Sequence, residues 1–258
     1  MKSLKIFFTV VLAISTLFLT SCSDDDTEDE TPAPAQLGTM KVEFEHVWGP
    51  DEAPFHLNEN YTHSITNEEL SFTTMRYYVS NIKLMKNDGT EFSAPNAYFI
   101  IDASDNGMHE VEIENVPAGD YESISFLVGV DSLRNVSGAQ EGALSASEGM
   151  FWSWNSGYIF VKAEGISAAA ENNAFAYHIG GFAGENKAQR EHYMDFDGAL
   201  LEVTPNATPT VHLIVNPASF WNGMMSLGTL SNMTMPGPMA SMLANHFATG
   251  FRFDHIHN

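Results

Sequence analysis

Apolar and polar residues alternate along most of the chain that follows residue 38. In the stretch MKVEFEHVW, Val42, Phe44, His46 and Trp48 fall on one face of an extended strand, and the two glutamates between them fall on the other. A repeat of two over several residues is the pattern of a strand that buries one face. The stretch is therefore predicted to be a β-strand at the edge of an apolar core.

The same period recurs in segments that are rich in β-branched and aromatic residues. Turn-forming residues separate them, and Asp88-Gly89 is a strong hairpin dipeptide. Short strands at this spacing predict an all-β fold, an antiparallel β-sandwich formed as a single domain over residues 38–258. The predicted strands lie within residues 70–92, 97–102, 109–116, 120–131, 156–165, 174–181, 199–204 and 210–216.

Two segments depart from this alternation. Residues 133–150 are small, polar and glycine-bearing, and they are predicted to form a long ordered loop. Residues 235–247 begin with proline and carry apolar residues at helical spacing, so they are predicted to form a short C-terminal helix. Met235, Met239 and Met242 follow the spacing of a buried helix face.

The N-terminus has the pattern of a secretory signal. Two lysines precede an apolar run that is too short to span a membrane, so residues 1–21 are predicted to be removed. The sequence LTSC resembles a bacterial lipobox, which makes Cys22 the predicted lipidated residue. The acidic, proline-containing residues 22–37 then form a solvated tether, either a plain spacer or a surface-export signal. An ordinary signal peptide with an incidental cysteine is the alternative to an outer-membrane lipoprotein.

Charge and cysteine content exclude several classes of function. Loss of residues 1–21 removes two of the 11 basic residues and none of the 33 acidic ones, which leaves a net charge of −24. Such a surface repels nucleic acid and anionic headgroups. With its one cysteine lipidated, the mature chain has no disulfide and no thiolate ligand or nucleophile. The familiar signatures of hydrolases, zinc proteases and nucleotide-binding enzymes are missing, so a non-enzymatic protein is expected.

Imidazole is then the strongest metal ligand that remains. His255 and His257 stand two apart in DHIHN, so both rings can reach one ion, although the segment could also be a solvated tail. His178 faces outward among alanines on a predicted strand, where it is either a ligand or a structural residue. The other histidines provide no spacing argument; they are His46, His56, His63, His109, His192, His212 and His246.

Methionines form a second set of soft ligands near the C-terminus. Thioethers favour Cu(I), but methionine also fills gaps in apolar cores, and core packing is the simpler interpretation. The set comprises Met224, Met225, Met233, Met235, Met239 and Met242.

Several segments together resemble the MbnP-like proteins, a family associated with copper. The resemblance runs from about residue 39 to the C-terminus. GMFWSWNSGYIFVKAEG at residues 149–165 and the GVDS…N…GAL pattern within residues 114–144 are its most specific parts. It also includes FTTMRYYVSNIKL, FAYHIGG and the closing FDHIHN.

The resemblance implies an extracytoplasmic copper-binding protein of the lipoprotein branch. The copper is expected as Cu(I), with His178, His255 and His257 as nitrogen ligands. Either Trp152 or Trp154 is expected beside it, and in some relatives a dihaem peroxidase-like partner enzyme oxidises one tryptophan to kynurenine. The sequence alone leaves open which tryptophan corresponds.

A non-catalytic surface module that binds a glycan, a peptide or a partner lipoprotein is the alternative function. Exposed aromatic rings stack on sugars, and the chain offers four tryptophans for this role. They are Trp48, Trp152, Trp154 and Trp221.

Overall fold

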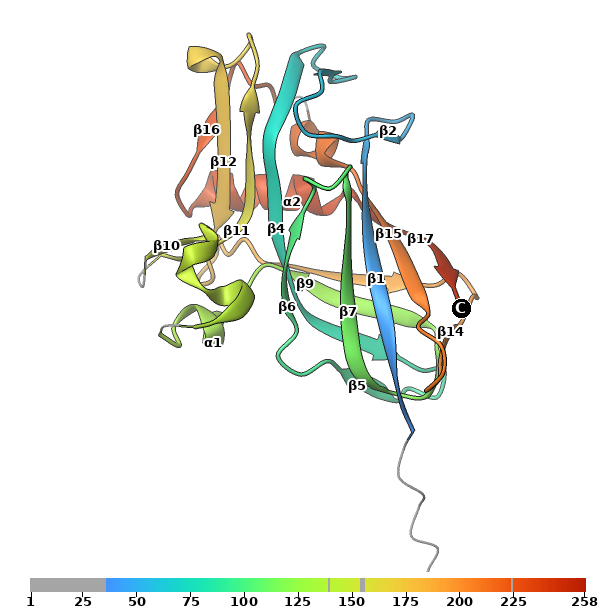
Figure 1. Cartoon of the computed structure of the whole chain (residues 1–258). Helices are drawn as coiled ribbons and strands as arrows, with labels where there is room; N and C mark the ends of the chain where they lie inside the picture. The colour runs from blue at the N-terminus through green and yellow to red at the C-terminus, as the bar shows by residue number, and fades with distance from the viewer. Residues whose placement is uncertain (1–35, 139, 154–155, 224) are drawn as a thin grey trace, which may run out of the picture. The chain divides into compact units, whose positions relative to one another are not determined.

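Strands dominate the computed structural model, which describes residues 36–138, 140–153, 156–223 and 225–258 (Figure 1). One sheet has five strands, in which β1 lies between β7 and β15 and β17 forms an edge. Its strands are β1 (Leu37–Trp48), β2 (Ala53–Pro54), β7 (Met108–Pro117), β15 (Thr210–Val215) and β17 (Phe251–His257).

A larger sheet of ten strands is organised around one long strand, β4 (Glu69–Met85). In the order of the sheet, β13 (Arg190–Asp195), β9 (Ser123–Val128), β4, β11 (Gly157–Ile166), β12 (Ala174–Gly180) and β16 (Asn232–Met233) are neighbours. Shorter strands pair with β4 or β11, namely β3 (Tyr61–Thr62), β5 (Glu91–Ser93), β6 (Tyr98–Asp102) and β10 (Phe151–Ser153). The pair β8 (Gly119–Tyr121) and β14 (Leu201–Val203) stands apart.

This architecture confirms the predicted all-β class with a short helix near the C-terminus. Most strand pairs are antiparallel, but β1 pairs with β15 and β12 pairs with β16 in parallel. Two strands that pair in parallel need a long connection between them. The β1–β15 pair accordingly joins segments from opposite ends of the domain, and it places polar residues that are distant in the sequence side by side.

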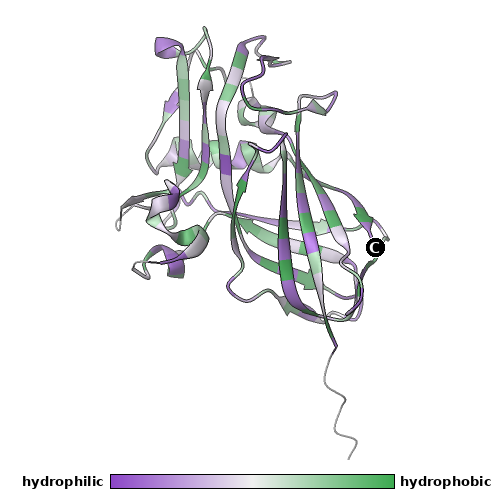
Figure 2. Cartoon of the chain, viewed as in Figure 1, coloured by the Kyte–Doolittle hydropathy of each residue, from purple (hydrophilic) through white to green (hydrophobic). Residues whose placement is uncertain are grey.

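The alternation predicted from the sequence is seen directly in β1. Met40, Val42 and Phe44 are fully buried, whereas Lys41, Glu43 and Glu45 on the opposite face are partly exposed. Figure 2 shows the same change of hydrophilic and hydrophobic positions along the long strands. One face of the five-stranded sheet therefore covers the core and the other carries charge.

Helices are few among the described residues. The segment 133–150 contains no strand within its described part and carries α1 (Ser132–Asn135) and short 3₁₀ turns, as expected of an ordered loop. The 3₁₀ turns of the described chain are Gly142–Leu144, Ala146–Glu148, Glu171–Asn173 and Pro217–Trp221. None of the described helices is both long and apolar enough to cross a membrane.

The C-terminal helix, α2 (Pro238–Ala248), begins three residues later than predicted. Pro238 occupies its first turn, where a missing backbone N–H costs nothing. The prediction that methionines line its buried face is wrong. Met235 precedes the helix and is 71% exposed, and Met239 is 40% exposed. The buried stripe instead consists of Ala240, Leu243, Ala244 and Phe247.

The predicted signal peptide, the predicted lipidation site Cys22 and nearly all of the predicted acidic tether lie outside the described residues, as do Met224 and Trp154. The predicted hairpin at Asp88-Gly89 lies within them and is confirmed. Gly89 has a φ of +81°, and the backbone N–H of Thr90 donates to the Asp88 carboxylate at 2.8 Å. Glycine adopts this left-handed conformation without steric cost.

Candidate metal site

A row of polar side chains crosses three neighbouring strands on the outer face of the five-stranded sheet. Glu43 of β1 is the register partner of His212 on β15, and His212 is in turn the register partner of His255 on β17. Cross-strand partners carry their side chains on the same face of a sheet. The residues are far apart in the sequence, and only this pairing places them side by side.

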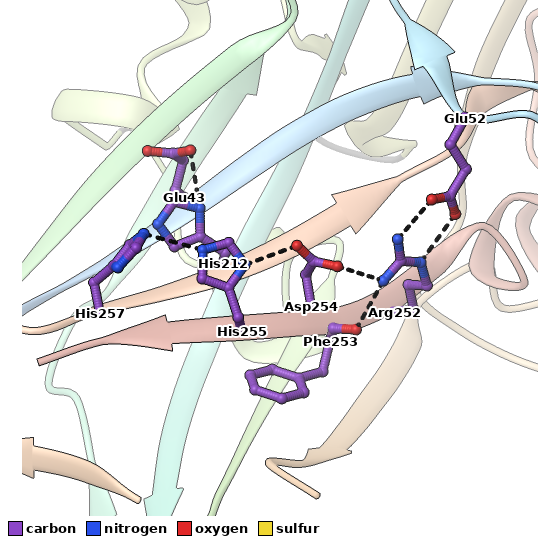
Figure 3. A network of polar contacts seen from close by, with 8 residues as sticks. All are labelled: Glu43, Glu52, His212, Arg252, Phe253, Asp254, His255 and His257. Carbon is purple, nitrogen blue, oxygen red and sulfur yellow. Dashed lines mark hydrogen bonds and ion pairs between the residues drawn. The ribbon is translucent and has the colours of Figure 1, made fainter. Parts of the chain in front are cut away.

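A bulge in β17 adds a fourth group to the row. His212 pairs with His255, but the next residue, Leu213, pairs with Phe253, so Asp254 is an extra residue on β17. Bulges redirect side chains that strict alternation would send to the other face. Asp254 accordingly contacts the ring of its neighbour, with 2.8 Å between its Oδ2 and His255 Nδ1 (Figure 3).

His257 completes a cluster of three imidazoles. It lies two residues beyond His255, and the Nε2 atoms of the two rings are 3.0 Å apart. The ring of His212 stacks on that of His255 with centroids 4.2 Å apart, and His257 stands nearly perpendicular to both. One ligand nitrogen from each residue lies within 4.8 Å of the other two.

The spacing of these ring nitrogens suits a metal ion once the wider pairs move closer together. Two nitrogens that bind one ion at about 2.0–2.1 Å lie roughly 3–3.4 Å apart, and never more than roughly 4.2 Å. The 3.0 Å separation of His255 and His257 already fits. A spread of up to 4.8 Å over all three means that the widest pair has to close by up to roughly 1.4 Å to reach the same range. The donor set fits copper, because imidazole is among its preferred ligands.

Hydrogen bonds assign the ring nitrogens. Carboxylates lie next to Nδ1 of two rings: Asp254 Oδ2 accepts from His255 at 2.8 Å, and Glu43 Oε1 lies 3.1 Å from Nδ1 of His212 in an ion-pair contact. A neutral ring that donates through Nδ1 has its lone pair on Nε2. His255 Nε2 is then the acceptor of its contact with His257, whose Nε2 carries the proton. A metal ion between these rings would take the place of that proton.

The surroundings favour the neutral ring of His212 and the ionised carboxylate of Asp254. Burial lowers the pKa of His212, and the facing rings of His255 and His257 lower it further, against the opposing effect of Glu43. A hydrogen bond from Arg252 is the main cause that lowers the pKa of Asp254. Metal binding requires deprotonated imidazole, so the lowered pKa of His212 favours the form of this ring that can bind a metal.

Arg252 itself is held in place by a second carboxylate. Its Nε and one terminal nitrogen bond the two oxygens of Glu52 at 3.0 and 2.7 Å, and its other terminal nitrogen bonds Asp254 at 2.7 Å. A two-point contact between a guanidinium and a carboxylate fixes the orientation of both groups. Figure 3 shows the network running from Glu52 to the imidazoles.

The third predicted ligand, His178, lies elsewhere. It is on β12 of the ten-stranded sheet, where its Nε2 is 2.7 Å from Glu164 Oε1. It is not a member of the three-histidine cluster. The three histidines chosen from the sequence therefore do not form one site, and a metal role for His178 stays a prediction.

Trp152 lies near His178 rather than near the cluster. It is partly buried in β10, and its ring packs against Gly180, so closely that a Cβ on this glycine would come within 2.7 Å of it. Gly180 is two residues beyond His178 on the same strand. The other candidate for a modified aromatic, Trp154, lies outside the described residues.

Two of the four tryptophans proposed to stack on sugars are core residues, so that part of the alternative function is wrong. Trp48 is 6% exposed and Trp221 is fully buried. Their indole nitrogens donate to Thr62 O and to Tyr177 Oη, each at 3.2 Å. Both rings are enclosed by other aromatic residues and present no face to a ligand.

Two further histidines belong to the core and are not ligand candidates. The Nδ1 of His46 donates to Gly107 O at 2.6 Å and its Nε2 is 3.2 Å from Tyr77 Oη, so the neutral ring uses both nitrogens. His192 packs between Phe126 and Phe251. Burial lowers the pKa of His46 and of His192 to about 4 in each case.

Sequence reasoning missed His212, Glu43 and Asp254. The available signal was that His212 is a polar residue on the outward face of an otherwise apolar strand, TVHLIVN. Such a position is equally suited to an ordinary surface residue. Only the register of β1, β15 and β17 singles it out.

Comparisons with known proteins agree with the fold. The structure of MbnP from Methylosinus trichosporium superposes with a TM-score of 0.56 and 15% sequence identity, covering 80% of this chain and 88% of that one. Identity at this level supports the fold alone. No curated protein sequence matches the chain.

The MbnP family pattern matches residues 37–236, which is most of the chain. His212 lies inside this match, and His255 and His257 follow it. The fold agrees with this match, and the family pattern over most of the chain shows that the chain belongs to the MbnP family.

Proposed function

We propose that this protein binds copper without catalysing a reaction and that His212, His255 and His257 hold the ion. The observation that carries the proposal is the convergence of three imidazoles on one exposed face, with carboxylates behind two of them. Family membership supports copper over other metals that imidazole binds. The expected form is Cu(I), which three nitrogen ligands accommodate.

The position of the cluster favours exchange of the ion with other molecules. His255 and His257 are exposed on β17, an edge strand of its sheet, whereas His212 is only 14% exposed. These histidines would hold the ion from the sheet side and leave its solvent side accessible to another molecule. This arrangement suits acquisition or handling of copper better than permanent storage.

The cellular setting follows from the sequence and is part of the same proposal. Removal of residues 1–21 and lipidation of Cys22 would attach the protein to the outer membrane of a Gram-negative bacterium, with the acidic tether holding the domain at the cell surface. A dihaem peroxidase-like partner would act on Trp152 or Trp154. The intact mass of native protein would report both lipidation and conversion of a tryptophan to kynurenine.

Copper titration of the metal-free protein tests the proposed site. We expect His212→Ala and the double variant His255→Ala, His257→Ala each to weaken binding, and His178→Ala to leave it unchanged. Both Cu(I) and Cu(II) should be titrated, with Zn(II) as a competitor. An affinity unchanged in the double variant would remove the cluster from the proposal. A loss confined to His178→Ala would transfer the site to β12 beside Trp152.

A further inference from the structure

Two carboxylates contact the imidazoles on the side away from the cluster. Asp254 accepts a hydrogen bond from His255 Nδ1 at 2.8 Å, and Glu43 Oε1 forms a charge contact with His212 Nδ1 at 3.1 Å. The described contacts include no such partner for His257, whose hydrogen bond is to His255. The cluster therefore combines two oriented rings with one that is held less firmly.

We infer that Glu43 and Asp254 are positioning residues that hold His212 and His255 with Nε2 facing the metal, an inference that rests on the proposed function. A carboxylate on Nδ1 fixes both the tautomer and the orientation of a ligand imidazole, and it makes the other nitrogen a stronger donor. Neither carboxylate is a ligand in this arrangement. Each acts through its histidine.

The surroundings restrict both carboxylates. Glu43 is on a central strand and its side chain is 15% exposed, so it has little freedom to turn away from His212. Asp254 is more exposed, at 32%, but Arg252 bonds it and is itself held by Glu52. The bulge in β17 is what places Asp254 on this face. Burial thus holds Glu43 beside His212, and the bond from Arg252 holds Asp254 beside His255.

The chain provides a matched control for charge. Glu45 lies two residues beyond Glu43 on the same face of β1, but its register partner is Ile214 instead of a histidine. Glu45→Ala removes the same negative charge from the same strand without removing a contact to the cluster. Any general effect of net charge on cation affinity therefore appears in this variant as well.

The experiment measures the imidazole tautomers and the copper affinity of the full mature protein. Long-range ¹H–¹⁵N NMR at pH 8 reports, without metal, which ring nitrogen is protonated. We expect His212 and His255 to be Nδ1–H tautomers, and Glu43→Ala and Asp254→Ala each to abolish this preference at its own histidine. Copper affinity should fall by about 10–100-fold in each variant. Glu43→Gln and Asp254→Asn should recover part of it, because an amide oxygen still accepts from Nδ1.

Two results would overturn the inference. One is an unchanged tautomer in the alanine variants, and the other is an affinity loss no larger than that of Glu45→Ala. Failure of the proposed function is recognised separately. A wild-type protein that binds no copper refutes the function, while the tautomers of the metal-free protein still test the role of the two carboxylates.

Discussion

Acidification should destabilise the protein through the buried imidazole of His192. The ring lies against Phe126, with centroids 5.1 Å apart and planes 12° from parallel, and against Phe251 at 4.6 Å. Its Nε2 is buried and has no hydrogen-bond partner among the described residues. Nothing there compensates a positive charge, and burial lowers the pKa of His192 from 6.5 to about 4.

The sign follows from which state binds the proton. Below pH 6.5 the unfolded chain protonates this histidine, while the folded chain holds it neutral down to about pH 4. The unfolded state therefore gains about 1.4 kcal/mol per pH unit within this window, and the contribution is absent above it. Integrated from pH 7.5 to 5.0, the loss of stability due to His192 alone is about 2 kcal/mol.

His192→Phe isolates this effect. Phenylalanine keeps an aromatic ring between the two neighbours and removes both the titration and the unpaired Nε2. Because an unsatisfied buried polar atom costs about 1–3 kcal/mol, the variant should be more stable at pH 7.5 and gain a further 2 kcal/mol or so at pH 5.0. Urea unfolding in the presence of a chelator measures the free energy of unfolding at both pH values without any contribution from bound metal.

Tyr193→Phe is the matched control, since it makes a conservative change at a position on the same strand that is 65% exposed. The stability of Tyr193→Phe should depend on pH as that of the wild type does. His46 is present in both variants and in the wild type, so its titration cancels when each variant is compared with the wild type. The reasoning is refuted if His192→Phe and wild type lose stability in parallel between pH 7.5 and 5.0.

Three further outcomes are expected. Gly165→Ala should lower the free energy of unfolding by about 1–3 kcal/mol or more in urea unfolding, because a Cβ would come within 2.1 Å of Ser71 O. His46→Phe should cost about 1–3 kcal/mol, because Tyr77 Oη loses its partner in the core while Gly107 O keeps the backbone N–H of residue 46, and a thermal melt as stable as wild type would contradict this. Copper at 100 times its dissociation constant should stabilise the protein by about 2.7 kcal/mol, measured as a shift in Tm that is lost in the double variant of His255 and His257.

Local physical rules account for most of the fold that the sequence predicted. Alternation identified β1 and the strands of the sheets, because a half-buried strand has to place apolar side chains at every second residue. The turn at Asp88-Gly89 was equally local. The buried face of α2 was predicted wrongly, since methionine spacing alone does not show where a helix begins. Pro238 sets that start and turns Ala240 and Leu243 toward the core.

Strand pairing is not local, and this limited the prediction of the site. The spacing of His255 and His257 was visible in DHIHN, and the structure places their Nε2 atoms 3.0 Å apart. His178 was chosen from the family resemblance, because its position among alanines on the outward face of a strand equally suits a structural residue. Its sheet and its contact with Glu164 could be known only from the fold.

The sequence by itself determined which residues face the core, which face solvent and which types of side chain are available to bind a metal. Tertiary structure decided which of those outward residues meet. Glu43, His212 and His255 come together because β15 pairs in parallel with β1 and antiparallel with β17, and Asp254 joins them through a bulge. A shift of one residue in either pairing would send these side chains to opposite faces, since successive residues of a strand point in opposite directions.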